Sequence, residues 1–281
     1  MNSIEIKNVS KAYEKFLLND ISFNVPKGTI VGLVGENGAG KSTTLKLIMN
    51  AIKADKGTIS VLGKSNLSKE FEDIKQDIGI VLDEAYFPEV LNIKNINKIM
   101  KATYKNWQED KYFEYINKFS LPKDKKIKEF SRGMKMKLSI AVSLSHKAKL
   151  LILDEATGGL DPMIREEVLD IFNEFTRDEN NSILISSHII SDLEKICDYI
   201  VFINKGNIIL SEEKDLLLEK YSILKASEKE FEDIPFEAIK KKRKTNYGYE
   251  LLVYKDKINS VFNLEYTSLE NIVLFMAKED K

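Results

Sequence analysis

The segment Gly35-Glu-Asn-Gly-Ala-Gly-Lys-Ser42 has the residue types and the spacing of a loop that binds phosphate groups. Its glycines let the backbone wrap closely around phosphate oxygens and present several N–H groups to one anion. The Lys41 ammonium can reach the β- and γ-phosphates of a nucleotide, and the Ser42 hydroxyl can ligate Mg²⁺. We therefore expect a nucleotide site formed by Gly35, Asn37, Gly38, Gly40, Lys41, Ser42 and Thr43.

A second set of chemical groups ends the apolar run Leu150-Leu-Ile-Leu153. Asp154 is placed to join the Mg²⁺ shell, since a hard cation prefers carboxylate oxygen. Glu155 points to the opposite side of such a strand and could polarise an attacking water. Acidic residues end many strands, but a pair that follows a phosphate loop in the same chain predicts metal-assisted hydrolysis.

Strands and helices must position these groups. Apolar or alternating runs predict strands at Thr29–Val34, Ile78–Leu82, Leu150–Leu153, Ile183–Ser186 and Tyr199–Ile203, and helices at Lys41–Ala51 and Met163–Phe175. This alternation favours an α/β fold with a largely parallel sheet. From about Asp83 to His146 apolar residues recur at helical spacing, which predicts a helical insertion. Further helix and strand patterns at Leu216–Tyr221, Tyr249–Tyr254 and Leu269–Met276 predict a small C-terminal accessory domain.

Composition limits the classes of function. The net charge of −1 gives no overall attraction to nucleic acid or anionic lipid. The N-terminus lacks the apolar core of a signal peptide, and no stretch approaches the ~18–20 apolar residues that span a bilayer. Cys197 is the one cysteine, so no internal disulfide forms, and we expect a small buried residue in a reducing compartment. His146 is expected to lie in a surface loop.

Three further segments and one tyrosine lie in a defined order around the phosphate loop and the acidic pair. Phe130-Ser-Arg-Gly-Met134 precedes the acidic pair, and Gly158-Gly-Leu-Asp161 and Ile185-Ser-Ser-His188 come after it. Tyr13 lies upstream of the phosphate loop. In this order, over about residues 1–210, the chain resembles the ATP-binding-cassette (ABC) ATPases.

The resemblance implies a P-loop NTPase fold: a RecA-like core with an antiparallel β subdomain and a helical insertion. The expected boundaries are 1–214 for the nucleotide-binding domain, with its helical subdomain at about 83–146, and 215–281 for the accessory domain. Two copies would close head-to-tail around two Mg·ATP, and Ser131, Arg132 and Gly133 would act as the signature in trans. Asp161 would link the two sites, His188 would contact the γ-phosphate, and Tyr13 would stack on adenine.

Two motifs, at three positions, depart from the family's usual residues. Arg132 replaces the first glycine of the signature and Met134 its glutamine, a variant that resembles ABC-2-type exporter subunits, including those for antimicrobial peptides and phenol-soluble modulins. Asp83 stands where the family carries the Q-loop glutamine. A carboxylate can still ligate Mg²⁺, but it adds negative charge near Asp154 and Glu155.

The function expected from this resemblance is ATP hydrolysis that drives a membrane exporter of a peptide or amphipathic drug-like cargo. The chain would lie on the cytoplasmic face of a bacterial membrane and contact a separate polytopic subunit through residues near Glu84–Asn97. Its other partner is a second cassette, identical or related, and no nucleic acid is expected. Two alternatives stay open: a soluble ABC ATPase acting on nucleic acid or ribosomes, and a nucleotide-gated module with little turnover.

Overall fold

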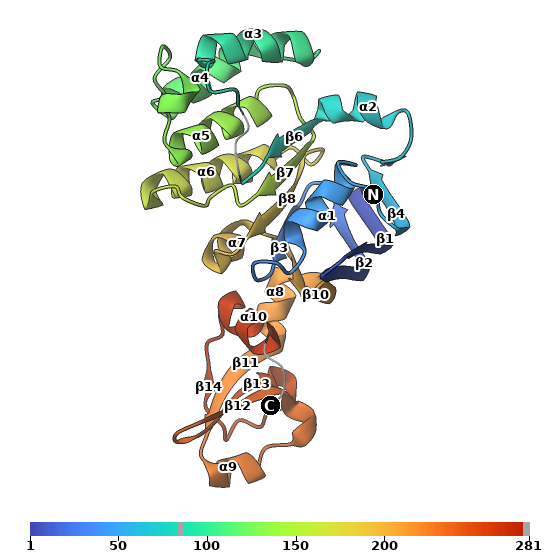
Figure 1. The fold of residues 1–281 in the computed structure, drawn as a ribbon. Helices are drawn as coiled ribbons and strands as arrows, with labels where there is room; N and C mark the ends of the chain where they lie inside the picture. Colours follow the sequence, from blue (N-terminus) through green and yellow to red (C-terminus); the bar gives the residue numbers. More distant parts are fainter. Residues whose placement is uncertain (84–86, 278–281) are drawn as a thin grey trace.

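The computed structural model describes residues 1–83 and 87–277 and arranges them in three parts (Figure 1). The central part carries a six-stranded sheet in the order β10-β9-β3-β8-β7-β6 and a four-stranded sheet in the order β2-β1-β4-β5. The strands of the six-stranded sheet are β3 (Ile30–Val34), β6 (Ile78–Val81), β7 (Leu150–Asp154), β8 (Ser182–Ser187), β9 (Tyr199–Asn204) and β10 (Asn207–Glu213). The four-stranded sheet contains β1 (Asn2–Tyr13), β2 (Phe16–Pro26), β4 (Lys56–Val61) and β5 (Lys64–Ser65).

The six-stranded sheet is parallel from β9 to β6, as predicted, and only β10 runs antiparallel, on the outer edge of β9. Every residue of β3, β7 and β8 is buried, which explains why these segments are almost continuously apolar. Alternate residues of these strands pack into two separate hydrophobic cores. Val31 and Leu33 face the antiparallel sheet and α1 (Lys41–Ile48), whereas Leu151 and Leu153 face the helices on the other side.

The predicted helical insertion contains α3 (Ile93–Thr103), α4 (Glu109–Lys118) and α5 (Arg132–Ser143), and α6 (Pro162–Phe175) packs beneath it (Figure 1). Asn92 begins α3 with a reciprocal capping box to Asn95. Tyr112 is fully buried between these helices. The first residues of the segment expected to meet a membrane subunit, 84–86, lie outside the described part of the chain. The remaining helices of the central part are α2 (Phe71–Ile74) and α7 (Ile190–Ile196).

The C-terminal part, as far as residue 277, is a four-stranded antiparallel sheet in the order β12-β13-β11-β14 with three α-helices. Its elements are α8 (Lys214–Lys220), β11 (Tyr221–Ala226), α9 (Glu228–Glu232), β12 (Ile239–Thr245), β13 (Gly248–Tyr254), β14 (Leu264–Glu265) and α10 (Leu269–Ala277). Helix α10 packs back onto the cassette at both of its ends. Glu194 on α7 accepts a hydrogen bond from the Leu269 N–H at 3.0 Å, and the Asn204 amide donates to the Ala277 carbonyl at 3.3 Å.

Within residues 1–83 and 87–277, none of the helices has both the length and the apolar character needed to cross a membrane. Cys197 is buried, as expected.

The prediction for His146 is wrong: this residue is buried, with 1% of its surface exposed. Its ring stacks on Tyr104, with 3.9 Å between the ring centroids, and its Nδ1 lies 3.1 Å from the Gln76 carbonyl oxygen. The loop after α5 turns under the helical insertion on its way to β7, so the insertion covers it. The sequence around His146, a polar residue in a connecting segment, does not indicate that the helical insertion buries it.

The buried His146 predicts a specific acid sensitivity of folding. Burial lowers the pKa of His146, whereas in the unfolded chain the imidazole titrates at its ordinary value of about 6.5. Between the folded and unfolded pKa values the unfolded chain binds the extra proton, so the free energy of unfolding falls as the pH drops below about 6.5.

We expect His146→Phe, which keeps a ring against Tyr104, to lose less melting temperature than the wild type between pH 7.5 and 5.5. Thermal unfolding followed by circular dichroism at both pH values measures this difference. Equal losses in the two proteins would contradict the prediction.

Candidate nucleotide-binding site

Four neighbouring parallel strands bring the predicted site residues to one edge of the central sheet. Strands β3, β8, β7 and β6 are hydrogen-bonded in that order, so their carboxyl ends lie side by side. The phosphate loop follows β3, His188 follows β8, Glu155 follows β7 and Asp83 follows β6. The carboxyl edge of such a sheet is where open α/β folds bind ligands.

The phosphate loop takes a conformation that depends on glycine at two positions. Gly40 precedes α1 with φ of 117°, a region that favours glycine. A Cβ atom on Gly35 would lie 2.4 Å from the Ile203 carbonyl oxygen. The Gly40 position also leaves α1 without a side-chain cap, so the first N–H groups of the helix are available to an anion.

Lys41 is buried at the start of α1 and lies over the loop. Its Nζ donates to the carbonyl oxygens of Gly35 at 2.8 Å and Glu36 at 3.2 Å. The same Nζ lies 3.7 Å from Glu155 Oε1. The ammonium group is thus held by oxygen atoms at the point where the loop would receive phosphate oxygens.

Glu155 connects the acidic strand end to His188. Its Oε2 lies 2.5 Å from His188 Nδ1 and accepts the His188 backbone N–H at 3.3 Å. Glu155 has φ of 52°, an unfavourable backbone conformation for a residue other than glycine, and such strain concentrates at functional sites. His188 itself is 59% exposed, so one face of its ring is open to a ligand. The structure therefore brings Lys41, Glu155 and His188 together.

Asp154 is held by Ser186, a residue that had no predicted role. The Ser186 hydroxyl donates to Asp154 Oδ1 at 2.5 Å, because Asp154 and Ser186 are paired in register across β7 and β8. The two serines before His188 could have suggested a hydroxyl partner for an acidic residue. Only the pairing of β7 with β8 shows that the Ser186 hydroxyl meets Asp154.

A pocket of about 490 Å³ opens at this edge. Its lining residues are Lys15, Phe16, Asn37, Gly38, Gly40, Lys41, Ser42, Thr43, Asp83 and Glu155. Loop N–H groups and a lysine suit a triphosphate, and the Ser42 hydroxyl with the carboxylates of Asp83 and Glu155 gives oxygen donors that fit Mg²⁺. Asp154, the other predicted metal ligand, is buried at the end of β7 and is not among the described lining residues. The residues present therefore fit both ATP and its metal.

The described lining of this pocket includes Phe16 and not Tyr13, and the stacking of Tyr13 on adenine stays a prediction. Tyr13, at the end of β1, is 48% exposed and has Lys11 Nζ 5.9 Å from its ring centroid. Phe16 begins β2 on the other side of the same hairpin, and Phe16 and Lys15 line the pocket. The sequence reasoning missed both residues, although an aromatic side chain three positions after Tyr13 could have suggested Phe16.

The signature and the D-loop begin helices on this side of the molecule. Ser131 caps α5, where its hydroxyl accepts the Met134 N–H at 3.2 Å, and this start of the helix is exposed. Asp161 caps α6 in the same way, accepting the Ile164 N–H at 3.1 Å. Arg132 forms an ion pair with Asp83. Among the described residues that line the 490 Å³ pocket, neither Ser131 nor Asp161 is included.

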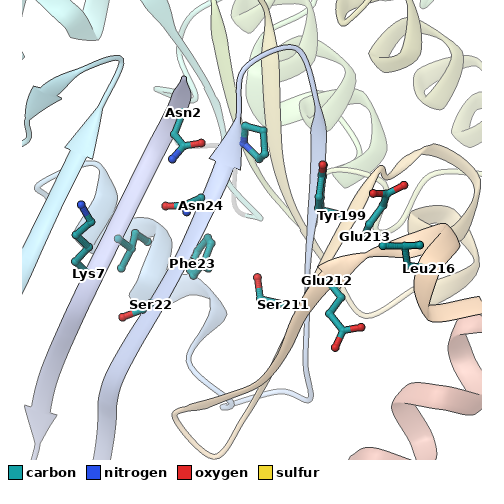
Figure 2. A pocket seen from close by; sticks show the side chains of 12 residues that line it. Asn2, Lys7, Ser22, Phe23, Asn24, Tyr199, Ser211, Glu212, Glu213 and Leu216 are labelled. Carbon is teal, nitrogen blue, oxygen red and sulfur yellow. The ribbon is translucent and has the colours of Figure 1, made fainter. Parts of the chain in front are cut away.

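A second pocket, of about 800 Å³, lies between β2 and the β9–β10 pair (Figure 2). Phe23, Tyr199 and Glu212 are among the residues that line it. Its lining contains none of the predicted site residues.

Known proteins with similar sequences and structures share this architecture. The ABC transporter family model matches residues 18–158. The lantibiotic transport ATP-binding protein SrtF of Streptococcus pyogenes is 38% identical over 215 residues, which cover 75% of this chain and 91% of SrtF. The bacitracin transport ATP-binding protein BcrA of Bacillus licheniformis is 30% identical over 252 residues, covering 88% of this chain and 74% of BcrA.

A match as long as that to BcrA extends past residue 214 into the C-terminal part. Among solved structures, the ATP-binding subunit of an ABC transporter superposes with a TM-score of 0.69 at 28% identity, covering 76% of this chain and 91% of that subunit. The fold, the assembled phosphate-loop edge and these similarities lead to one conclusion: the chain belongs to the ABC transporter family, as one of its ATP-binding, ATP-hydrolysing subunits.

Proposed function

We propose that this chain is the ATPase of a bacterial ABC-2-type exporter and that it acts as a head-to-tail dimer on a polytopic membrane subunit. The observation that carries the ATPase part is the convergence of Lys41, Glu155 and His188, which come from three different strand ends. A site that only bound nucleotide would need the phosphate loop alone. A carboxylate held between a lysine and an exposed histidine is suited to hydrolysis.

Each residue has a distinct role in the proposed reaction. Lys41 and the N–H groups at the start of α1 bind the phosphates and stabilise the negative charge that develops on them. Glu155 orients and polarises the attacking water, and His188 holds Glu155 and contacts the γ-phosphate. Mg²⁺, held by Ser42 and Asp154 with Asp83 nearby, would supply charge neutralisation at the β- and γ-phosphates when bound.

In the proposed dimer, the signature residues of one copy complete the nucleotide pocket of the other, whose own described lining lacks Ser131. The exposed start of α5 offers the Ser131 hydroxyl, backbone N–H groups and the positive end of a helix, all of which favour an anion. In the proposed dimer, Ser131 and Gly133 contact the γ-phosphate bound at Lys41 of the second copy, and Asp161 links the two sites. ATP binding then closes the dimer and hydrolysis reopens it.

The transport part rests on the relatives. SrtF and BcrA are named for transport of a lantibiotic and of bacitracin, and we infer export of a peptide or amphipathic cargo by similarity to them. The helical insertion, the part furthest from the C-terminal part in Figure 1, is the proposed contact with the membrane subunit on the cytoplasmic face. The structure offers no observation that favours a soluble ATPase acting on nucleic acid or ribosomes.

Glu155→Gln tests the mechanism. The amide keeps the size of the side chain but is a poor base, so we expect hydrolysis to slow by about 10²-fold or more. ATP should then hold the variant as a dimer, visible by light scattering after gel filtration. The control is Lys41→Ala in the same background, which should stay monomeric. Turnover at the wild-type rate in Glu155→Gln would contradict the proposed role.

Asp83→Asn tests the unusual Q-loop residue. Removing one carboxylate from the pocket should leave ATP binding intact but raise the Mg²⁺ concentration for half-maximal hydrolysis, by about tenfold if Asp83 supports the metal. Asp124→Asn, which removes an exposed carboxylate paired with Lys94, is the matched control. An unchanged Mg²⁺ titration in Asp83→Asn would remove Asp83 from the metal site.

A further inference from the structure

Two of the motif positions at which this chain departs from the family's usual residues, Asp83 and Arg132, contact each other. Asp83 follows β6, where the helical insertion begins, and Arg132 is the first residue of α5. Their ion pair therefore joins the two ends of the segment that holds α3 and α4. One partner lines the nucleotide pocket and the other follows Ser131, so the pair links the pocket to the signature of the same chain.

Arg132 also lies on the turn that follows Glu155. A Cβ atom on Gly159 would lie 3.7 Å from Arg132 Cδ, and one on Gly133 would lie 3.4 Å from the Gly159 carbonyl oxygen. The Gly158 N–H donates to the Glu155 carbonyl at 2.9 Å and closes this turn. The first residues of α5 thus rest on the segment that carries the water-polarising carboxylate.

The pair is easily exchanged. The side chains of Arg132 and Asp83 are 65% and 45% exposed, and an exposed pair of this kind shifts an equilibrium by only about 1.5- to 5-fold. A divalent cation carries twice the charge of a guanidinium and prefers carboxylate oxygen. In the pocket that Asp83 shares with Ser42 and Glu155, metal-bound nucleotide is the stronger partner for its carboxylate.

We propose that Asp83 binds Arg132 when the pocket is empty and exchanges it for the metal-bound nucleotide when the pocket fills. This inference rests on the proposed function. While the pair is formed, it holds the exposed start of α5 against its own chain at Gly159. Once the pair opens, this helix end can move and bring Ser131 to the nucleotide of the second copy. Arg132 is then a positioning residue, and the pair delays dimer closure until nucleotide is present.

Hydrogen–deuterium exchange at the start of α5 tests the proposal without relying on hydrolysis. The Met134 and Lys135 N–H groups, bonded to Ser131 at 3.2 Å and 3.0 Å, report on whether this helix end is held. We expect Asp83→Asn and Arg132→Gln each to raise their exchange by about 1.5- to 5-fold in nucleotide-free protein. Combining the two substitutions should add nothing further.

In the wild type, a non-hydrolysable ATP analogue with Mg²⁺ should produce the same rise, at a protein concentration where light scattering shows a monomer. The single variants should show no additional rise. The swap of Asp83→Arg with Arg132→Asp rebuilds the pair in reverse and should restore slow exchange in nucleotide-free protein. Asp124→Asn, which breaks the exposed 2.7 Å pair with Lys94 elsewhere in the insertion, should leave exchange unchanged.

Single variants that exchange as slowly as the wild type, or a swap that exchanges as fast as the singles, would overturn the proposal. An analogue that binds without changing exchange in the wild type would also overturn it and leave the proposed ATPase function standing. Failure of the wild type to bind the analogue at all would instead overturn the proposed function.

Discussion

The site depends on the hydrogen-bonded register of four parallel strands. The pairing of β3 with β8 and of β8 with β7 fixes where the phosphate loop, His188 and Glu155 lie relative to one another. Strands β3, β7 and β8 are completely buried, so a shift of one residue would move apolar side chains between two cores as well as separating the polar groups. Packing of the sheet therefore holds the backbone of the proposed catalytic residues in place.

The helical insertion and the C-terminal part both contact the central part close to residues of the site. Arg132 ties the start of α5 to Asp83, and α7, which follows His188, receives α10 of the C-terminal part through Glu194. Ile272 and Phe275 of α10 are buried in the same core as the helices of the insertion. The contacts that join the helical insertion and the C-terminal part to the central part thus begin within a few residues of the site.

The parts of this site that follow from local sequence were predictable. The strand before the phosphate loop, the helix after that loop and the acidic end of β7 all lie where the apolar patterns indicated. Contacts between distant segments were not predictable, because they depend on which strands are neighbours. The bond from Ser186 to Asp154, the Asp83–Arg132 pair and the burial of His146 all belong to this class.

The sequence also suggested that Asp83 adds negative charge near Asp154 and Glu155, and the structure shows that this carboxylate is paired with Arg132. Whether the assembled site drives transport is tested most directly by identifying the proteins that bind this chain in the cell. The tagged chain would be purified with ATP from detergent-solubilised native membranes, and the proteins that accompany it identified by mass spectrometry. We expect a polytopic membrane protein in stoichiometric amounts. Recovery from the soluble fraction alone, with no membrane partner, would contradict the assignment as an exporter subunit.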